Sequence, residues 1–239
     1  MSKNFKIFLG LSYLIILMIF LYYVFSYLQI SRLDDFSYYK ELQASIENFI
    51  TENMIINIIF FSLFCIIWIF LLGFGSPITL ASGILFGKWI GTIVSLISVC
   101  LGALLLYTIT DFFFKDLIKQ YLEKKFGKYI STFKKNEFLY YFIYRFIGGL
   151  GLPFFLQNTL PVIFSMSKTN YFFASLLGLI PGFFIFNTIG AGLNTYIKKS
   201  ETFSLIELIL TPEIYLPILT FVCLMLIAML IKKKFFDDR

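Results

Sequence analysis

Long apolar tracts separated by short polar stretches make up most of this chain. The tracts cover about residues 7–28, 54–110, 138–196 and 214–231. A helix needs about 20 apolar residues to cross the hydrocarbon core of a bilayer, and the first and last tracts meet that length. The two middle tracts are long enough for more than one pass each. The pattern predicts an all-α polytopic membrane protein.

Glycine and proline interrupt both middle tracts. Gly73-Phe-Gly-Ser-Pro77 divides the first tract, which is broken again near Gly87, and Gly148-Gly-Leu-Gly-Leu-Pro153 divides the second. Irregular backbone at membrane depth is tolerated only where protein or water covers it. We therefore expect helical hairpins that turn at these breaks and share a partly hydrated cavity. Two kinked but otherwise ordinary helices are the alternative.

The positive charges set the expected orientation. Seven lysines fall in the connector 111–137 and three follow the last tract, whereas the stretch 29–53 is acidic. Lysine and arginine accumulate in cytoplasmic loops. Two full crossings within 54–110 would place the connector outside. One re-entrant hairpin, 54–87, followed by one crossing, 88–110, places it inside.

The same reasoning gives a second hairpin that starts at residue 138 and a crossing at about 171–196. The expected fold therefore has four membrane-crossing helices plus two opposed re-entrant hairpins, with both termini cytoplasmic in the plasma membrane. The connector has apolar residues at helical spacing, which predicts an amphipathic helix on the membrane surface. A cytoplasmic helix that covers the protein itself is the alternative.

The two middle tracts also resemble each other. Gly73-x-Gly75-x-Pro77 recurs as Gly149-x-Gly151-x-Pro153, and the same spacing relates Gly102 to Gly178. An inverted repeat with broken helices is typical of secondary transporters. We divide the chain into an N-terminal span and acidic external segment, 1–53, a two-repeat core, 54–196, and a C-terminal span and basic tail, 197–239.

Composition narrows the function classes. Hydrophobic residues make up 59% of the chain and charged residues 14%, whereas soluble domains average about 45–50% and about 25%. The net charge of +6 does not indicate a nucleic-acid partner, because the lysines flank apolar tracts. There is no histidine, and all three cysteines lie inside apolar tracts. We expect no metal or other cofactor and no enzymatic activity.

Arg145 is the strongest candidate for a functional residue, because no acidic residue lies between Phe138 and Ser200. An intramembrane arginine marks a functional site by default, and a guanidinium binds phosphate groups in bidentate fashion. An arginine that extends to the membrane interface is the alternative. The candidate substrate-binding residues are Arg145, Ser76, Thr79, Gln157 and Asn158.

Glycines and prolines supply two further sets of candidates. Gly and Pro permit irregular backbone at a hairpin tip, and small residues permit close packing of membrane helices. The candidate tips are Gly73, Gly75, Pro77, Gly149, Gly151 and Pro153, and the candidate packing positions are Gly178, Pro181, Gly182 and Gly190. Ser82 and Asn187 add polar groups that either line a path or bond to helix backbone.

Three segments together resemble the DedA superfamily, also called the VTT or SNARE-associated domain. They are Gly75-Ser-Pro-Ile-Thr-Leu-Ala-Ser-Gly-Ile-Leu-Phe-Gly87, then Tyr144-Arg-Phe-Ile-Gly-Gly-Leu-Gly-Leu-Pro153 with Asn158, and Leu177-Gly-Leu-Ile-Pro-Gly-Phe-Phe184 with Gly190. The resemblance covers about residues 71–192. It implies two facing re-entrant hairpins with Pro77 and Pro153 at their tips, and a functional arginine at Arg145.

The resemblance also implies a scramblase or flippase that moves phospholipid or polyprenyl-phosphate lipid between leaflets. The partners would be membrane lipids with anionic headgroups, and a homo-oligomer is allowed. Residues 54–110 contain no Asp or Glu, which favours passive scrambling or another coupling ion over proton coupling through a buried carboxylate. A membrane scaffold or assembly factor without transport and a small-solute transporter are the alternative functions.

Overall fold

The computed structural model describes residues 35–72 and 74–232, together with isolated positions between Ser12 and Ser26. All regular secondary structure in the described part is helical, which confirms the predicted all-α class. The predicted first span, 7–28, lies outside the described residues except for those isolated positions. The helices are α2 (Phe36–Glu52), α3 (Met54–Leu72), α4 (Ser76–Lys135), α5 (Glu137–Phe146), η2 (Gly148–Gly151), α6 (Phe154–Thr159), η3 (Leu160–Phe164), α7 (Lys168–Lys199), α8 (Leu205–Leu210) and α9 (Pro212–Lys232).

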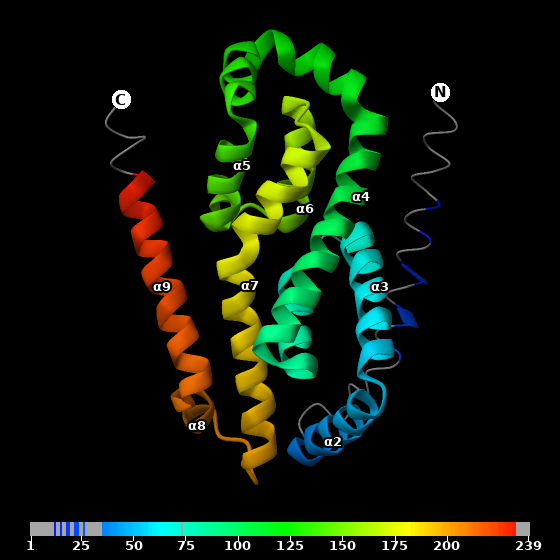
Figure 1. Cartoon of the computed structure of the whole chain (residues 1–239), viewed down its shortest axis with the longest axis vertical. Helices are drawn as coiled ribbons and strands as arrows, with labels where there is room; N and C mark the ends of the chain where they lie inside the picture. Colours follow the sequence, from blue (N-terminus) through cyan, green and yellow to red (C-terminus); the bar gives the residue numbers. More distant parts are fainter. Residues whose placement is uncertain are drawn as a thin grey trace.

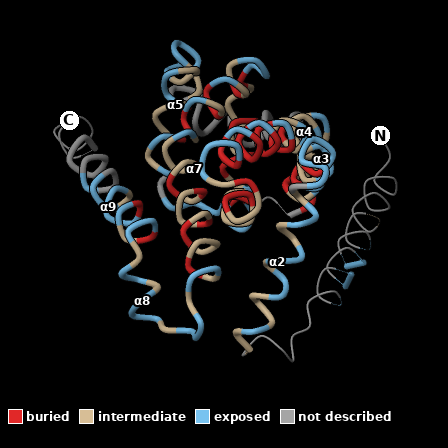
Figure 2. The backbone as a smooth tube through the Cα atoms, turned by 60° about the horizontal axis from the view of Figure 1, so that its bottom comes forward, coloured by how far each residue is buried: buried red, intermediate tan, exposed pale blue. Residues whose placement is uncertain are grey.

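Helices α4 and α7 lie side by side through the centre of the molecule (Figure 1). Helices α2 and α8 lie at one end, and the last part of α4 bends over the opposite end (Figure 1). Buried residues concentrate where α4 and α7 meet, whereas the outer sides of α3 and α9 are mostly exposed (Figure 2). An apolar exterior around a small-residue interior is the pattern of helices that pack within lipid.

The chain reverses direction at the breaks that the sequence predicts. Helix α3 ends at Leu72, and Gly87 interrupts α4 with φ 74° and ψ 178°. Ser82 and Gly91 lie on either side of Gly87, and the Ser82 hydroxyl donates to the Gly91 carbonyl at 2.8 Å. This contact shows that 76–86 folds back on the helix that follows. Glycine suits residue 87 because left-handed backbone is strained for other residues.

The two halves pack in the same way. A Cβ on Gly102 of α4 would lie 2.8 Å from the Ile66 carbonyl oxygen and 2.9 Å from the Ile69 Cβ of α3. A Cβ on Gly178 of α7 would lie 2.9 Å from the Phe142 carbonyl oxygen and 2.6 Å from the Arg145 Cβ of α5. The spacing that relates Gly102 to Gly178 also relates Ile66 to Phe142 and Ile69 to Arg145.

In Figure 1, α3 and α5 run toward the middle of the molecule from opposite ends. The glycine contact therefore occurs in both halves, between helices that run in opposite directions. In each half, a glycine in the long helix leaves room for the backbone of a shorter helix to come into contact. The side chains at the two contacts differ, and the larger change is that Ile69 of the first half corresponds to Arg145 of the second.

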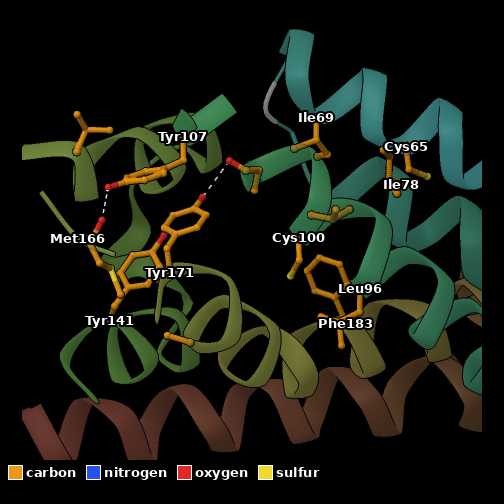
Figure 3. Packing of buried hydrophobic residues seen from close by; sticks show 14 residues of the cluster. Cys65, Ile69, Ile78, Leu96, Cys100, Tyr107, Tyr141, Met166, Tyr171 and Phe183 are labelled. Atoms are coloured by element: carbon orange, nitrogen blue, oxygen red, sulfur yellow. Dashed lines mark hydrogen bonds between the residues drawn. The ribbon is translucent and has the colours of Figure 1, made fainter. Parts of the chain in front are cut away.

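Tyrosines join the two halves near the centre (Figure 3). Tyr107 of α4 stacks on Tyr171 of α7 with ring centroids 4.5 Å apart, and Tyr141 of α5 stacks on Tyr171 at 5.3 Å. The Tyr107 hydroxyl donates to the Met166 carbonyl at 2.6 Å, and the Tyr171 hydroxyl donates to the Ala103 carbonyl at 3.3 Å. These contacts fix the start of α7 against α4 and α5.

A carboxylate joins the beginning of α5 to the beginning of α7. Glu137 Oε1 accepts from the Ser167 backbone N–H at 3.0 Å and from the Asn170 side-chain amide at 2.8 Å. Partial burial raises the pKa of Glu137, but these hydrogen bonds and nearby Lys134 outweigh it, so the pKa lies below its usual value. Charge-assisted hydrogen bonds therefore hold together the two ends of the segment from α5 to the start of α7, which contains the second break.

Three described helical segments are long and apolar enough to cross a membrane: Met54–Leu71, Ser76–Phe113 and Lys168–Lys199. We expected the first of these to be half of a hairpin, yet its length alone is sufficient for a span. The connector 111–137 is helical to Lys135, where it continues α4 and is not a separate helix. Its location on the membrane surface stays a prediction.

Candidate functional site

The second break is a short irregular segment that one side chain holds together. Helix α5 ends at Phe146, and α6 starts after Pro153. The side-chain amide of Gln157 donates to the Leu152 carbonyl at 2.7 Å and to the Gly148 carbonyl at 3.5 Å. Gln157 therefore satisfies backbone carbonyls that the helix break leaves without helical partners.

Gly149 makes room for this amide. Its φ is +67°, and a Cβ there would lie 2.1 Å from the Gln157 Cδ, which is closer than real Cβ contacts come. Both the left-handed backbone and the contact with Gln157 thus require glycine. Gly151 also has a positive φ, of +75°, but no atom lies within 4 Å of the place a Cβ would take.

Arg145 lies in the last turn of α5, and its side chain is 1% exposed. Its guanidinium donates to Gln157 Oε1 at 3.1 Å, to Asn158 Oδ1, and to the Tyr171 hydroxyl at 3.5 Å. The guanidinium also lies 5.0 Å from the Tyr141 ring centroid and 5.2 Å from that of Phe154. An arginine enclosed in this way does not extend to a membrane interface, so that alternative is wrong.

The surroundings of this cation are neutral. Its hydrogen-bond acceptors are amide and phenol oxygens, and aromatic faces add cation–π attraction. The position at the C-terminal end of α5 also favours a positive charge. Among the residues that line the cavity beside it there is no Asp or Glu. The positive charge of the guanidinium is therefore stabilised by dipoles and is not neutralised.

The first break approaches the second directly. A Cβ on Gly75 would lie 3.4 Å from the Phe154 ring. The Trp68 indole N–H donates to the Phe74 carbonyl at 2.9 Å, which is the counterpart of the Gln157 contact at the second break. Thr79 is 1% exposed, and its hydroxyl donates to the Ser76 carbonyl at 2.9 Å.

A cavity of about 330 Å³ lies where the two breaks meet. Residues from the first break, the second break, α7 and α9 line it; they include Gly75, Ser76, Thr79, Arg145, Gln157, Pro153, Gly178, Pro181, Gly182 and Phe221. Ligand pockets in proteins are typically about 300–1,000 Å³. The cavity is therefore large enough to hold a small charged group.

Several hydrogen-bond donors near the cavity lack acceptors. Arg145 Nε and, outside the cavity lining, Asn158 Nδ2 are buried and have no hydrogen-bond partner among the described residues. The N-terminal turn of α4 begins at Ser76 in the cavity wall, and its first backbone N–H groups, which Pro77 does not supply, have no intrahelical acceptor. A helix N-terminus and a guanidinium both favour a negative charge, so an anion suits this cavity.

The structure brings most of the sequence-predicted site residues together, with differences. Asn158 accepts from the guanidinium but does not line the cavity. Pro77 lies in the first turn of α4 and Pro153 caps α6, so each proline starts the second limb of its break rather than forming the turn. Gly73 lies outside the described residues.

The four predicted packing positions on α7 divide into two kinds. Gly178 packs on α5, and Gly190 packs on α4, where a Cβ would lie 2.3 Å from the Leu80 carbonyl oxygen. Gly182 is not a packing position, because no atom lies within 4 Å of its Cβ place; Gly182 and Pro181 line the cavity instead. Asn187 and Ser82 join a separate buried cluster with Ser95.

Sequence reasoning missed the aromatic residues of the site. Trp68, Tyr141, Tyr171 and Phe154 were not singled out, although each contacts a break or the guanidinium. Aromatic residues make up 21% of the chain, so single ones carried no signal. The repeat spacing gave a partial signal for the site as a whole, because it relates Arg145 to Ile69, which is buried in α3.

One comparison with known proteins gives a match. A family model described as the VTT domain matches residues 72–192, which is just over half of the chain. The matched region begins at the end of α3 and ends in α7, so it contains both breaks and Arg145 but not α9. No solved structure matches the chain.

Proposed function

Because this chain belongs to the VTT-domain family, also called the DedA or SNARE-associated family, we propose that it moves an anionic lipid between membrane leaflets. Family membership and the long apolar helices indicate a membrane protein with a transporter-like role. The finer proposal is that a phospholipid or polyprenyl-phosphate headgroup passes through the cavity beside Arg145. No chemical step is assigned to the chain.

The proposal places the two breaks at the middle of the bilayer. Segment 76–86 is roughly 16 Å long at helical rise, which is about half the hydrocarbon thickness. It therefore returns from mid-depth to the side where α3 began, and α3 with 76–86 forms a re-entrant hairpin. Helices α5 and α6 with η3 form the opposed hairpin. The crossings are the first span, α4 after Gly87, α7 and α9, with both termini in the cytoplasm of a plasma-membrane protein.

The observation that supports an anionic substrate most directly is the enclosed Arg145 guanidinium without a carboxylate. Burial of a charge costs several kcal/mol unless an opposite charge or strong hydrogen bonds compensate. Amide and phenol oxygens compensate only in part. A phosphate that enters the cavity supplies both the opposite charge and the acceptors that Arg145 Nε lacks.

The experiment compares Arg145→Ala with wild type in vesicles that contain fluorescent phosphatidylglycerol. Lipid that reaches the outer leaflet is bleached by dithionite, so the bleaching rate reports transbilayer movement. We expect Arg145→Ala to lose about 10-fold to 10²-fold in rate, because a charge-assisted pair is worth about 1.5–3 kcal/mol. Lys88→Ala removes an exposed cation on α4 and should keep the wild-type rate.

Arg145 also supports the fold, so Arg145→Lys and thermal stability in detergent are measured alongside. Lysine keeps the charge but not the bidentate geometry, and we expect partial activity in a folded protein. Folded Arg145→Ala that moves lipid at the wild-type rate would overturn the proposal. Wild-type protein that moves soluble glycerol phosphate but no lipid would indicate a small-solute transporter. Protein that moves neither, yet binds a defined partner, would indicate a scaffold.

A further inference from the structure

One wall of the cavity comes from outside the matched VTT domain. Phe221 of α9 lines the cavity and packs edge to face on Phe186 of α7, with ring centroids 6.0 Å apart. Helix α9 follows the matched region, which ends at residue 192. Near its start α9 is held on α7, where a Cβ on Gly192 would lie 2.9 Å from the Glu213 carbonyl oxygen. Farther along, α9 leans away from α7 and α5 (Figure 1).

Apolar side chains make up most of the cavity lining, and several of them are exposed. Phe74, Phe146 and Leu152 line it, and they are 51%, 44% and 39% exposed. These side chains come from the two breaks and reach the outer surface of the protein. Gly182 of α7 also lines the cavity and leaves open space, since nothing lies within 4 Å of its Cβ place. The route from Arg145 to the exterior is therefore bounded by hydrocarbon groups.

We propose that the apolar wall formed by Gly182, Phe186 and Phe221 seats the hydrocarbon chain of the lipid whose phosphate binds Arg145. This inference rests on the proposed function and adds which part of the substrate α9 recognises. A soluble anion has no use for an apolar edge, whereas a lipid needs one because most of its chain extends beyond the cavity. The cavity of about 330 Å³ holds the headgroup and the first part of the chain only.

The shape of this apolar wall, and not its hydrophobicity, determines which hydrocarbon chains it accepts. Moving a hydrocarbon chain from lipid to an apolar protein wall gives no hydrophobic gain, because lipid tails are as apolar as the side chains. The wall therefore selects chains by the room that it leaves. Phe221 limits that room from α9, and the missing side chain at Gly182 provides it. The size of these two residues should decide which chains pass.

Two opposite substitutions test the seat in the vesicle assay. Gly182→Leu places a side chain in the open space, where its Cβ has no atom within 4 Å, and we expect it to slow lipid movement at least about 10-fold. Its control is Ile180→Phe, which adds bulk on an exposed α7 position that does not line the cavity. Phe221→Ala enlarges the seat, and we expect it to raise the rate of branched-chain phosphatidylglycerol relative to the straight-chain lipid. Leu219→Ala, on the exposed side of α9, should leave that ratio unchanged.

The outcomes separate this inference from the proposed function. A wild-type protein that moves no lipid overturns both. Active wild type and inactive Arg145→Ala, together with Gly182→Leu at the wild-type rate and an unchanged chain preference in Phe221→Ala, overturn the chain seat alone. Slow lipid movement in Gly182→Leu together with an altered chain preference in Phe221→Ala supports it. Thermal stability of each variant in detergent identifies any that fails to fold.

Discussion

Gln157 connects the backbone of the second break to the charge at the centre of the site. Its amide nitrogen holds the Leu152 carbonyl, and its amide oxygen accepts from Arg145. The guanidinium therefore has a fixed position only while the break keeps its shape. Gln157 thus positions the guanidinium, and because it also lines the cavity, its direct binding of substrate stays a prediction.

This link predicts different effects at two neighbouring glycines. Gly149→Ala strains a left-handed residue and forces the Gln157 amide away, so we expect a loss of about 2–4 kcal/mol in stability. Gly151→Ala has the same backbone strain in open space, so the loss should be only about 1 kcal/mol. Thermal unfolding followed by tryptophan fluorescence measures both. Equal losses would show that contact with Gln157 does not matter.

Single polar residues were the part of the site that could be predicted. Arg145, Gln157 and Asn158 stand out because they interrupt an apolar tract in which each costs free energy. Their mutual hydrogen bonds could not be predicted, because the break places Gln157 beside Arg145 through left-handed glycines that the sequence does not specify in detail. The roles of Tyr141 and Tyr171 depend on α5 and α7 meeting, which is a tertiary fact.

At the scale of elements, each helix break is closed by one side chain from an adjoining helix. Trp68 of α3 bonds to the Phe74 carbonyl at the first break, and Gln157 of α6 bonds to carbonyls of the second. A backbone carbonyl without a partner is costly in a low-dielectric setting. These contacts satisfy backbone carbonyls at the breaks, so the chain can reverse direction there without continuing as a helix.

The Trp68 contact gives a prediction for the first break. Trp68→Phe keeps an aromatic ring but removes the N–H donor, which should cost about 1 kcal/mol locally. We expect amide hydrogens of residues 74–76 to exchange about fivefold faster. Trp89→Phe is the matched control, because Trp89 is 66% exposed and packs on Phe184 away from the break. Identical exchange in the two variants would remove the proposed role of the indole.

The breaks themselves were predictable, because glycine and proline clusters stand out in apolar tracts. The continuity of α4 into the connector was not. No glycine or proline lies between Ala103 and Phe126, so the sequence has no helix terminator at the end of the crossing. The change from apolar to lysine-rich residues suggested a boundary, but a helix can pass from lipid to water without ending.

At the scale of the whole molecule, charged residues gather at two opposite ends of the fold. Helix α2 bonds to the end of α7 through the Glu47–Lys198 ion pair at 2.6 Å and through Lys40 Nζ, which donates to the Ser200 carbonyl at 2.8 Å. The hydrogen bonds from Lys198 and Gln43 hold the pKa of the Glu47 carboxyl below its usual value. The lysine-rich end of α4 lies at the opposite end of the molecule (Figure 1).

This arrangement predicts a labelling pattern for cysteines in a variant without Cys65, Cys100 and Cys223. Single cysteines at Asn53, Lys88 and Glu201 should react with a membrane-impermeant maleimide added to intact cells. A cysteine at Ser131 should react only after the membrane is opened. All four native residues are exposed. Reaction of Asn53→Cys and Lys88→Cys from opposite sides would mean that α3 and 76–86 do not form a re-entrant hairpin.

The matched glycine contacts have a consequence for how such a protein can arise. Two identical halves packed in this way would each place the same residue opposite glycine, so a guanidinium in one half would bring a second one in the other. Two like charges close together in a low-dielectric interior repel strongly. Because the two halves are joined in one chain, equivalent positions can hold different residues, as Ile69 and Arg145 do. One chain with two joined halves can thus carry a single positive charge at this contact, which a symmetric pair of identical chains cannot.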